Sequence, residues 1–207
     1  MLRYIALFIS VVFQPLLIPT LVFGLILYLV PEASSIPLEI KSTILLLVVL
    51  STLAIPMITI FGLRLSGTIK SIHMVEIKDR VIPFVITCIY FLMTTYFLHE
   101  KVEIDPVLWQ VLALISLTIV GLTVVTFFWK MSAHMTGMGG LVAIVIVLGI
   151  KFATFMPLYP LLGALVLSGI VGTSRLYLNA HKPLETYIGF VYGFVCSFVG
   201  FLYIYSW

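Results

Sequence analysis

Seven long apolar stretches, separated by short polar ones, constrain this chain more than any other feature. A helix of about 20 apolar residues crosses the hydrocarbon core of a bilayer. Only 9% of the residues are charged, and a soluble domain of this length needs more charge to keep its surface hydrated. We therefore predict an all-α polytopic membrane bundle with about six to seven transmembrane helices, forming one integral membrane domain over residues 1–207. The expected spans lie near residues 4–30, 42–63, 81–98, 107–129, 140–156, 158–172 and 186–207.

The remaining composition narrows the function classes. The net charge of +3 carries no nucleic-acid signature. The apolar composition makes the lipid bilayer an expected partner, and no oligomeric state is assigned. Cys88 and Cys196 both fall inside apolar stretches and are expected to be core residues without a disulfide. The N-terminal apolar run is longer than the core of a signal peptide, so we expect it to be a retained span.

Polar and helix-breaking residues interrupt some of these stretches. Gln14, Pro15 and Pro19 lie within the first one, which predicts a kink that faces other protein. Between the second and third spans, isoleucine and valine alternate with charged residues. This pattern predicts a short interfacial segment around residues 64–80.

A polar stretch at residues 174–185 precedes the last span. His181 and Glu185 are four residues apart, a spacing that places two side chains on one face if the segment is helical. A carboxylate that holds one imidazole nitrogen leaves the other as an oriented base or nucleophile. Arg175 could bind phosphate or carboxylate oxygens through its planar fork of donors. The simpler interpretation is an ordinary interhelical loop whose Arg and Lys side chains reach the lipid headgroups.

Three polar stretches share a face of the membrane if all seven segments cross. Two spans separate residues 64–83 from residues 132–134, and two more separate these from residues 174–185. The parity allows a single site to be assembled from all three stretches.

The spacing within residues 174–185 resembles the third signature of the type 2 phosphatidic acid phosphatase superfamily. That signature is Ser-Arg, five residues, His, three residues and Asp. Here Ser174 and Arg175 are followed by His181 and then by Glu185, which replaces the aspartate.

Two further stretches correspond to the other signatures of the family. Ser132-Ala133-His134 resembles the second signature, Pro-Ser-Gly-His. The first signature, Lys, six residues and Arg-Pro, is matched poorly. Arg80 is the best candidate for its arginine, but Pro83 follows three residues later, and Lys78 lies nearby as a substitute cation.

The resemblance implies a phosphatase that acts on a phosphomonoester or pyrophosphate of a membrane lipid, such as phosphatidate, phosphatidylglycerophosphate or an isoprenoid phosphate. His181 would attack phosphorus and form a phosphohistidine, Glu185 would orient it, and His134 would protonate the leaving alcohol and then activate water. No metal or other cofactor is implied. The residues expected to bind the substrate are Arg175, Arg80, Ser132, Ser174 and Lys78. Phosphoryl transfer does need an in-line nucleophile with positive donors around the equatorial oxygens.

Two other functions remain open at this stage. A catalytically inactive lipid-phosphate binder or carrier on the same scaffold would explain the irregular first signature. A small transporter would explain the proline-broken spans.

The charge distribution bears on which membrane face carries these residues. The positive-inside rule favours the cytoplasm for the end that carries the motifs, whereas enzymes of the resembled family usually face the periplasm or a lumen, so the face is left open. We expect a multi-pass protein of the bacterial inner membrane. The Lys and Arg residues on the motif side are Arg3, Arg64, Lys70, Lys78, Arg80, Lys130, Arg175 and Lys182, and those on the other side are Lys41, Lys101 and Lys151.

Overall fold

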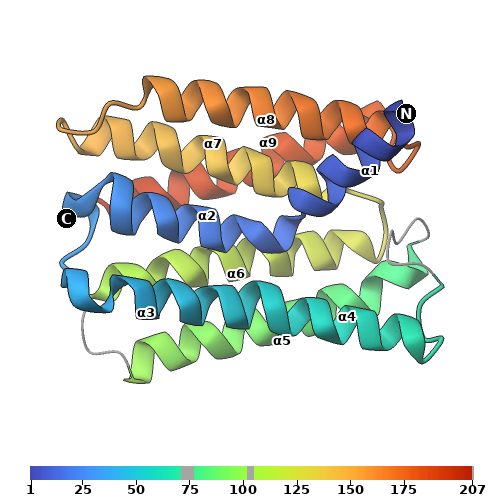
Figure 1. The fold of residues 1–207 in the computed structure, drawn as a ribbon, viewed down its shortest axis with the longest axis horizontal. Coiled ribbons are helices and arrows are strands. Elements are labelled where there is room, and N and C mark those ends of the chain that lie inside the picture. The colour runs from blue at the N-terminus through green and yellow to red at the C-terminus, as the bar shows by residue number, and fades with distance from the viewer. Residues whose placement is uncertain (71–76, 102–104, 207) are drawn as a thin grey trace.

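The computed structural model describes residues 1–70, 77–101 and 105–206, and in these residues it contains helices and no strands. The helices run side by side along the long axis of the molecule (Figure 1). The elements are α1 (Leu2–Val12), η1 (Pro15–Leu17), α2 (Ile18–Gly24), η2 (Leu25–Leu29), η3 (Pro31–Ala33), α3 (Leu38–Val49), η4 (Leu50–Ala54), α4 (Ile55–Leu65), α5 (Lys78–Lys101), α6 (Pro106–Thr126), α7 (Ala133–Lys151), α8 (Leu158–Tyr177) and α9 (Pro183–Ile204).

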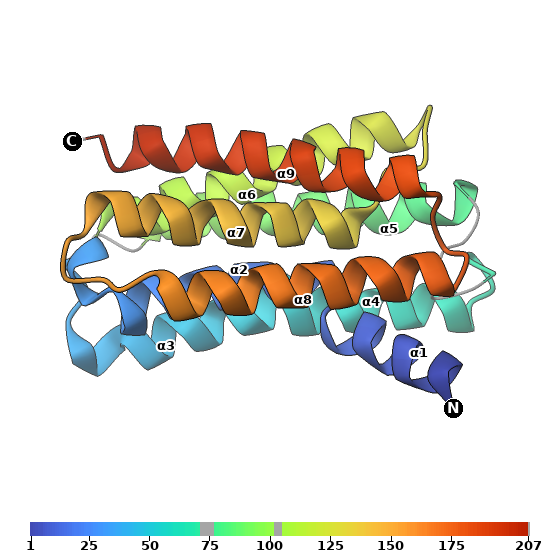
Figure 2. The same cartoon turned by 90° about the horizontal axis from the view of Figure 1, so that it is seen from above.

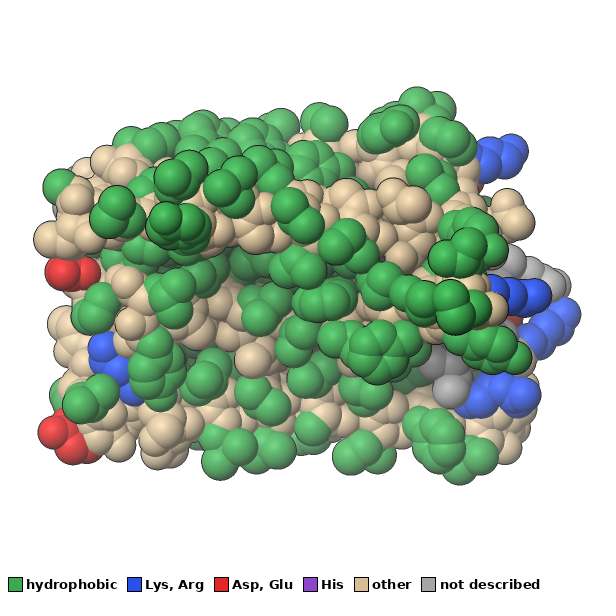
Figure 3. All heavy atoms as spheres, turned by 45° about the horizontal axis from the view of Figure 1, so that its top comes forward, with side chains coloured by type: hydrophobic (Ala, Val, Ile, Leu, Met, Phe, Trp, Pro, Cys, Tyr) green, Lys and Arg blue, Asp and Glu red, His purple; other side chains and the backbone are tan. Residues whose placement is uncertain are grey.

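Seven helical segments in the described residues are long and apolar enough to cross a membrane. They confirm the prediction of an all-α, multi-pass bundle, at the upper end of the expected number. The segments are Leu2–Leu29, Leu38–Leu65, Asp79–Glu100, Pro106–Thr126, Ala133–Lys151, Leu158–Tyr177 and Pro183–Ile204. Hydrophobic side chains cover the flank of the bundle, and Lys and Arg side chains gather mainly at the right-hand end in Figure 3. This is the distribution that lipid around the flank and water at the ends would favour.

The predicted helix boundaries were wrong at two places near the polar stretches. The fifth span begins at Ala133 rather than near residue 140, because Ser132 caps the helix there. The sixth span continues to Tyr177 rather than ending near residue 172, so Ser174 and Arg175 belong to a helix and not to a loop.

The connection between the second and third spans is described only in part. α4 ends at Leu65, and Gly67 turns the chain with a φ of 77°, a backbone conformation that glycine adopts without strain. Residues 71–76 lie outside the described residues, so the interfacial segment around residues 64–80 stays a prediction.

The prolines of the first span break its helix as the sequence predicts. α1 ends at Val12, a short 3-10 turn follows over Pro15–Leu17, and α2 begins at Ile18. Figure 2 shows α1 leaving the bundle at an angle to its neighbours. Because the span is broken, α1 and α2 point in different directions, and the residues at the end of α1 lie at the bend between them.

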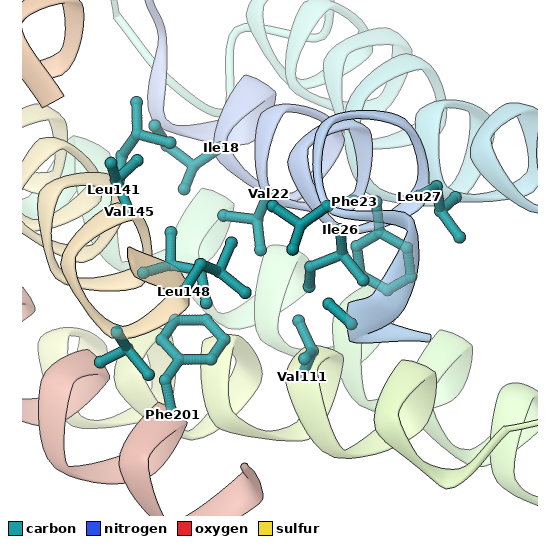
Figure 4. Close-up of a cluster of buried hydrophobic side chains, with 14 of the residues drawn as sticks. Ile18, Val22, Phe23, Ile26, Leu27, Val111, Leu141, Val145, Leu148 and Phe201 are labelled. Carbon is teal, nitrogen blue, oxygen red and sulfur yellow. The ribbon is translucent and has the colours of Figure 1, made fainter. Parts of the chain in front are cut away.

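α7 is the central helix of the bundle. In the most apolar 18 residues of this span, 72% of the residues are buried, compared with 39% or less in the corresponding stretches of the other spans. Side chains from four spans meet beside it, including Phe23 of α2, Val111 of α6, Leu148 of α7 and Phe201 of α9 (Figure 4). A functional group placed on α7 is therefore held by a close-packed support.

Candidate functional site

The C-terminal end of α8 is closed by a left-handed residue. Asn179 has a φ of 51°, and its amide donates to the carbonyl of Leu176 at 2.9 Å, while the amide of Ala180 donates to the carbonyl of Arg175 at 3.1 Å. These are the two hydrogen bonds of a Schellman motif, in which asparagine can replace glycine. The motif fixes the direction of the chain just before His181.

The N-terminal end of α9 fixes His181 and Glu185 together. Pro183 starts the helix and holds Lys182 in an extended conformation. Oε2 of Glu185 then accepts the backbone amide of Lys182 at 3.2 Å and lies 2.9 Å from Nδ1 of His181. The sequence spacing predicted this pairing along one helical face, whereas the structure makes it across a helix N-terminus. Both side chains are buried.

Arg80, at the start of α5, lies on the other side of the His181 ring. Its Nη2 is 3.3 Å from Nε2 of His181, and its Nη1 donates to the carbonyl of Met131 at 3.3 Å. A guanidinium has donors and no acceptor. Nε2 of His181 must therefore be the unprotonated nitrogen, and Nδ1 carries the hydrogen that is donated to Glu185. The two neighbours together select the tautomer in which Nε2 keeps its lone pair.

The start of α7 is attached to α9 and carries His134. The amide of Ser132 donates to the carbonyl of Glu185 at 3.2 Å, so the α7 terminus lies directly against the turn that holds His181. Nε2 of His134, in the first turn of α7, is 3.0 Å from the carbonyl oxygen of Ser10 in α1. Since a carbonyl only accepts, Nε2 of His134 carries a hydrogen, and Nδ1 is the nitrogen that remains for other chemistry.

The four ionisable side chains from the three polar stretches line one cavity. Arg80, His134, Arg175 and His181 all border a cavity of about 240 Å³. The other walls are mostly apolar and come largely from α1, η1, α4, α5 and α6. They consist of Ser10, Val11, Gln14, Pro15, Leu16, Met57, Ile60, Phe61, Phe84, Thr87, Ile119, Leu122 and Ala133. The cavity is therefore polar at one end and apolar over most of its remaining surface.

Arg175 contributes a buried donor that the protein itself does not use. Its side chain is 5% exposed, and its Nε has no hydrogen-bond acceptor among the described residues. A buried, unpaired guanidinium N–H costs folding free energy. Such a group at a cavity wall favours an anionic ligand.

The electrostatic surroundings of His181 are positive. Burial, followed by the charges of Arg80 and Arg175, lowers the pKa of His181 from 6.5 to about 2. Burial, followed by the charge of Arg80, also lowers the pKa of the Lys130 ammonium, which lies just before α7. His181 is consequently neutral at physiological pH, which is the state that a nucleophilic imidazole requires.

Two of the predicted substrate-binding residues bond elsewhere in the structure, and a third stays a prediction. Ser132 caps α7, where its Oγ accepts the amide of Met135 at 3.5 Å. Ser174 donates its hydroxyl to the carbonyl of Ile170 at 2.8 Å. Neither serine lines the cavity. Lys78 is the first residue of α5, and its side chain lies outside the described part of the chain.

Sequence reasoning missed the contribution of the first two spans. Ser10, Met57 and Phe61 line the cavity, although nothing in the motifs pointed to the first 60 residues. One signal was present, because Gln14 is a polar residue within an apolar span. Its Nε2 lies 2.7 Å from Sδ of Met57, which links the end of α1 to α4 beside the cavity.

No group of three or more His, Cys, Asp or Glu side chains that could hold a metal ion occurs within the described residues. The chain matches no family model, no curated protein and no solved structure.

Proposed function

We propose that this protein is a lipid phosphate phosphatase that hydrolyses a phosphomonoester or pyrophosphate of a membrane lipid through a His181 nucleophile. One observation carries the proposal. His181 lies between Glu185 at Nδ1 and Arg80 at Nε2, so that its unprotonated nitrogen is beside a guanidinium. Membership of the type 2 phosphatidic acid phosphatase superfamily, which rests on the motifs, and a bacterial inner-membrane location belong to the same proposal.

The first step would transfer the phosphoryl group to His181. Arg80 and Arg175 would bind equatorial oxygens of the phosphate, with Lys130 adding positive charge. The lone pair of Nε2 would attack phosphorus, a P–N bond would form, and the bond from phosphorus to the departing oxygen would break. This oxygen is the ester oxygen of a phosphomonoester or the bridging oxygen of a pyrophosphate. Glu185 would stabilise the positive charge that develops on the imidazole.

His134 would act as the general acid and base through Nδ1, because its Nε2–H is donated to the carbonyl of Ser10. It would take up a proton as the substrate binds, give it to the departing oxygen, and later accept one from the water that attacks the phosphohistidine. In that second step a P–O bond would form, the P–N bond would break, and Nε2 of His181 would regain its lone pair. The products would be the lipid alcohol, or a lipid monophosphate from a pyrophosphate, together with inorganic phosphate.

The apolar walls of the cavity support a lipid substrate. Val11, Met57, Ile60 and Phe61 line it from α1 and α4, and the first of these helices diverges from the bundle (Figure 2). The polar end would hold the phosphate while the apolar end holds the first part of the chain.

His181→Asn tests the mechanism, because asparagine keeps a polar side chain but cannot form the phosphoryl intermediate. Phosphate release from phosphatidate, phosphatidylglycerophosphate and an isoprenoid diphosphate would be measured in detergent micelles and liposomes. We expect a loss of at least roughly 10³-fold. The matched control is His99→Asn, since His99 is a half-exposed histidine at the other end of α5, and it should keep wild-type activity. Unchanged release from His181→Asn would refute the mechanism.

A second candidate, a lipid-phosphate binder without turnover, is favoured by the Arg80–His181 contact, because the guanidinium lies against the nitrogen that would have to attack. The two functions differ in one measurement. A binder would hold a lipid phosphate in detergent and release no inorganic phosphate from any member of the panel.

A further inference from the structure

Ser10, a residue of the cavity wall, carries a hydroxyl group that no contact within the described residues explains. Ser10 is 5% exposed and borders the cavity. Its Oγ has no hydrogen-bond partner among the described residues, while its carbonyl accepts Nε2 of His134. A buried hydroxyl without a partner costs folding free energy, so its presence at this position indicates a ligand that uses it.

Three other buried serines of this bundle satisfy their hydroxyls in a way that Ser10 does not. Ser116, Ser168 and Ser174 donate their hydroxyls to the carbonyls of Leu112, Ala164 and Ile170, four residues earlier, at 2.7–2.8 Å. This bond is the usual way for a helical serine to satisfy its hydroxyl in an apolar setting. Ser10, which lies on the cavity wall, does not make this bond.

The position of Ser10 relative to the two histidines indicates which part of a substrate it would meet. In-line displacement places the departing oxygen on the side of phosphorus opposite Nε2 of His181. His134, the proposed acid, is bonded to Ser10 itself. Ser10 therefore lies beside the group that would protonate the departing oxygen.

We infer that the Ser10 hydroxyl is a specificity-determining donor for the leaving-group side of the substrate. This inference rests on the proposed function and names its substrate class: lipid phosphates with an acceptor oxygen close to the ester oxygen that departs. Such an oxygen is supplied by the second phosphate of a diphosphate or by a glycerol backbone. A simple alkyl monophosphate lacks it.

Binding of three phosphonate analogues, which resist hydrolysis, tests the inference without requiring turnover. The ligands are an alkyl phosphonate, an alkyl methylene-diphosphonate and the phosphonate analogue of a monoacylglycerol phosphate, all with the same chain length. Their dissociation constants would be measured by calorimetry in detergent for the wild-type protein, Ser10→Ala and Ser168→Ala. Ser168 is the matched control, because it is similarly buried at 6% exposure but satisfies its hydroxyl within α8 and lies away from the cavity.

We expect Ser10→Ala to bind either the diphosphonate or the glycerol analogue roughly tenfold more weakly, as the loss of one hydrogen bond predicts. The alkyl phosphonate should bind within about twofold of the wild type, and Ser168→Ala should match the wild type for all three. The analogue that is weakened identifies which source of the acceptor oxygen the site prefers. Ser10→Cys, which keeps the size and a weak donor, should lie between the wild type and Ser10→Ala.

Three outcomes would overturn the inference. They are equal weakening of all three ligands, no weakening of any, or failure of the wild-type protein to bind any of them. Phosphate release is measured separately. A wild-type protein that binds selectively through Ser10 but releases no phosphate would refute the enzymatic proposal and leave the role of Ser10 standing.

Discussion

Arg80, His181 and Glu185 form a line in which each side chain constrains the next. The guanidinium can only donate and the carboxylate can only accept, so the ring between them has a single consistent tautomer. Glu185 has a second role, because it also accepts the amide at the start of α9. The residue that orients the proposed nucleophile thus also stabilises the helix that carries it.

The lowered pKa of His181 predicts how stability changes with pH. In the folded protein the pKa is about 2, below its ordinary value of 6.5. Below pH 6.5 the unfolded chain therefore binds a proton that the folded chain does not, and the folded state loses stability as the pH falls. Above pH 6.5 this contribution vanishes. We expect His181 to reduce the unfolding free energy by about 2 kcal/mol at pH 5 relative to pH 7.

Thermal unfolding in detergent, compared between the wild type and His181→Gln, checks this expectation. The wild type should lose more stability between pH 7 and pH 5 than the variant, and the two curves should run parallel above pH 7, which serves as the internal control. Parallel curves over the whole range would show that His181 is not held neutral in the folded protein.

Arg175 predicts opposite effects on stability and on ligand binding. Its buried Nε lacks an acceptor among the described residues, so Arg175→Met should remove an unfavourable group and keep or raise the melting temperature without ligand. The same change should weaken binding of a lipid phosphonate by at least roughly tenfold, because an ion-paired hydrogen bond to the phosphate is lost.

Differential scanning fluorimetry and calorimetric binding provide the two measurements. The matched control is Arg3→Met, at the start of α1 and exposed to solvent, which should change neither by much. A marked fall in melting temperature for Arg175→Met, with ligand binding intact, would assign Arg175 a structural role and exclude it from the site.

Close packing of helix α7 against helix α9 holds together the two segments that carry His134 and His181. A Cβ added at Gly193 of α9 would overlap the backbone carbonyl of Thr136 in α7, and backbone cannot move aside as a flexible side chain can. The contact is equally close from the other side, because a Cβ added at Gly139 of α7 would overlap the backbone carbonyl of Phe190 in α9. The two helices can approach this closely because glycine has no side chain at the point of contact.

Gly193→Ala should destabilise the bundle by about 1–3 kcal/mol, the usual cost of overpacking a core, and should lower activity by displacing the α7 terminus from the α9 turn. Gly163→Ala in α8 is the matched control, since nothing lies within 4 Å of its added Cβ. The check is the melting temperature in detergent for both variants. Equal melting temperatures would mean that the helices can separate without cost.

The path of the whole chain brings the polar stretches to one end of the bundle. With seven crossings, residues near Arg3, Lys130 and Lys182 share one face, and residues near Glu39 lie on the other. Figure 1 shows the N-terminus at the end opposite the C-terminus, as an odd number of spans requires. A site composed of groups from α1, α5, α7, α8 and the α9 turn depends on this arrangement.

Single-cysteine labelling tests the path. In a background in which Cys88 and Cys196 are replaced by alanine, Arg3→Cys and Lys182→Cys should react with an impermeant thiol reagent from the same side of sealed vesicles. Glu39→Cys should react only from the other side. Labelling of the first two variants from opposite sides would contradict seven crossings, and the side that reacts also decides which face of the membrane carries the site.

The amino-acid sequence by itself determined that this protein is a membrane bundle of about six to seven spans, and it indicated that the polar stretches collect at one end of the bundle. Those properties follow from the lengths of apolar runs and from parity, which are local and additive. It also indicated the pairing of His181 with Glu185, although the reason was wrong in detail, since the contact forms across a helix start.

Only the tertiary structure decided which polar residues face the cavity and which serve the backbone. Arg80, with its poorly matched motif, reaches His181, whereas Ser132 and Ser174 bond within their own helical regions. The proline break in the first span brings Ser10 to His134 across 124 positions of sequence. Such contacts depend on how helices pack in three dimensions, and neither composition nor spacing along the chain encodes the direction in which a side chain points.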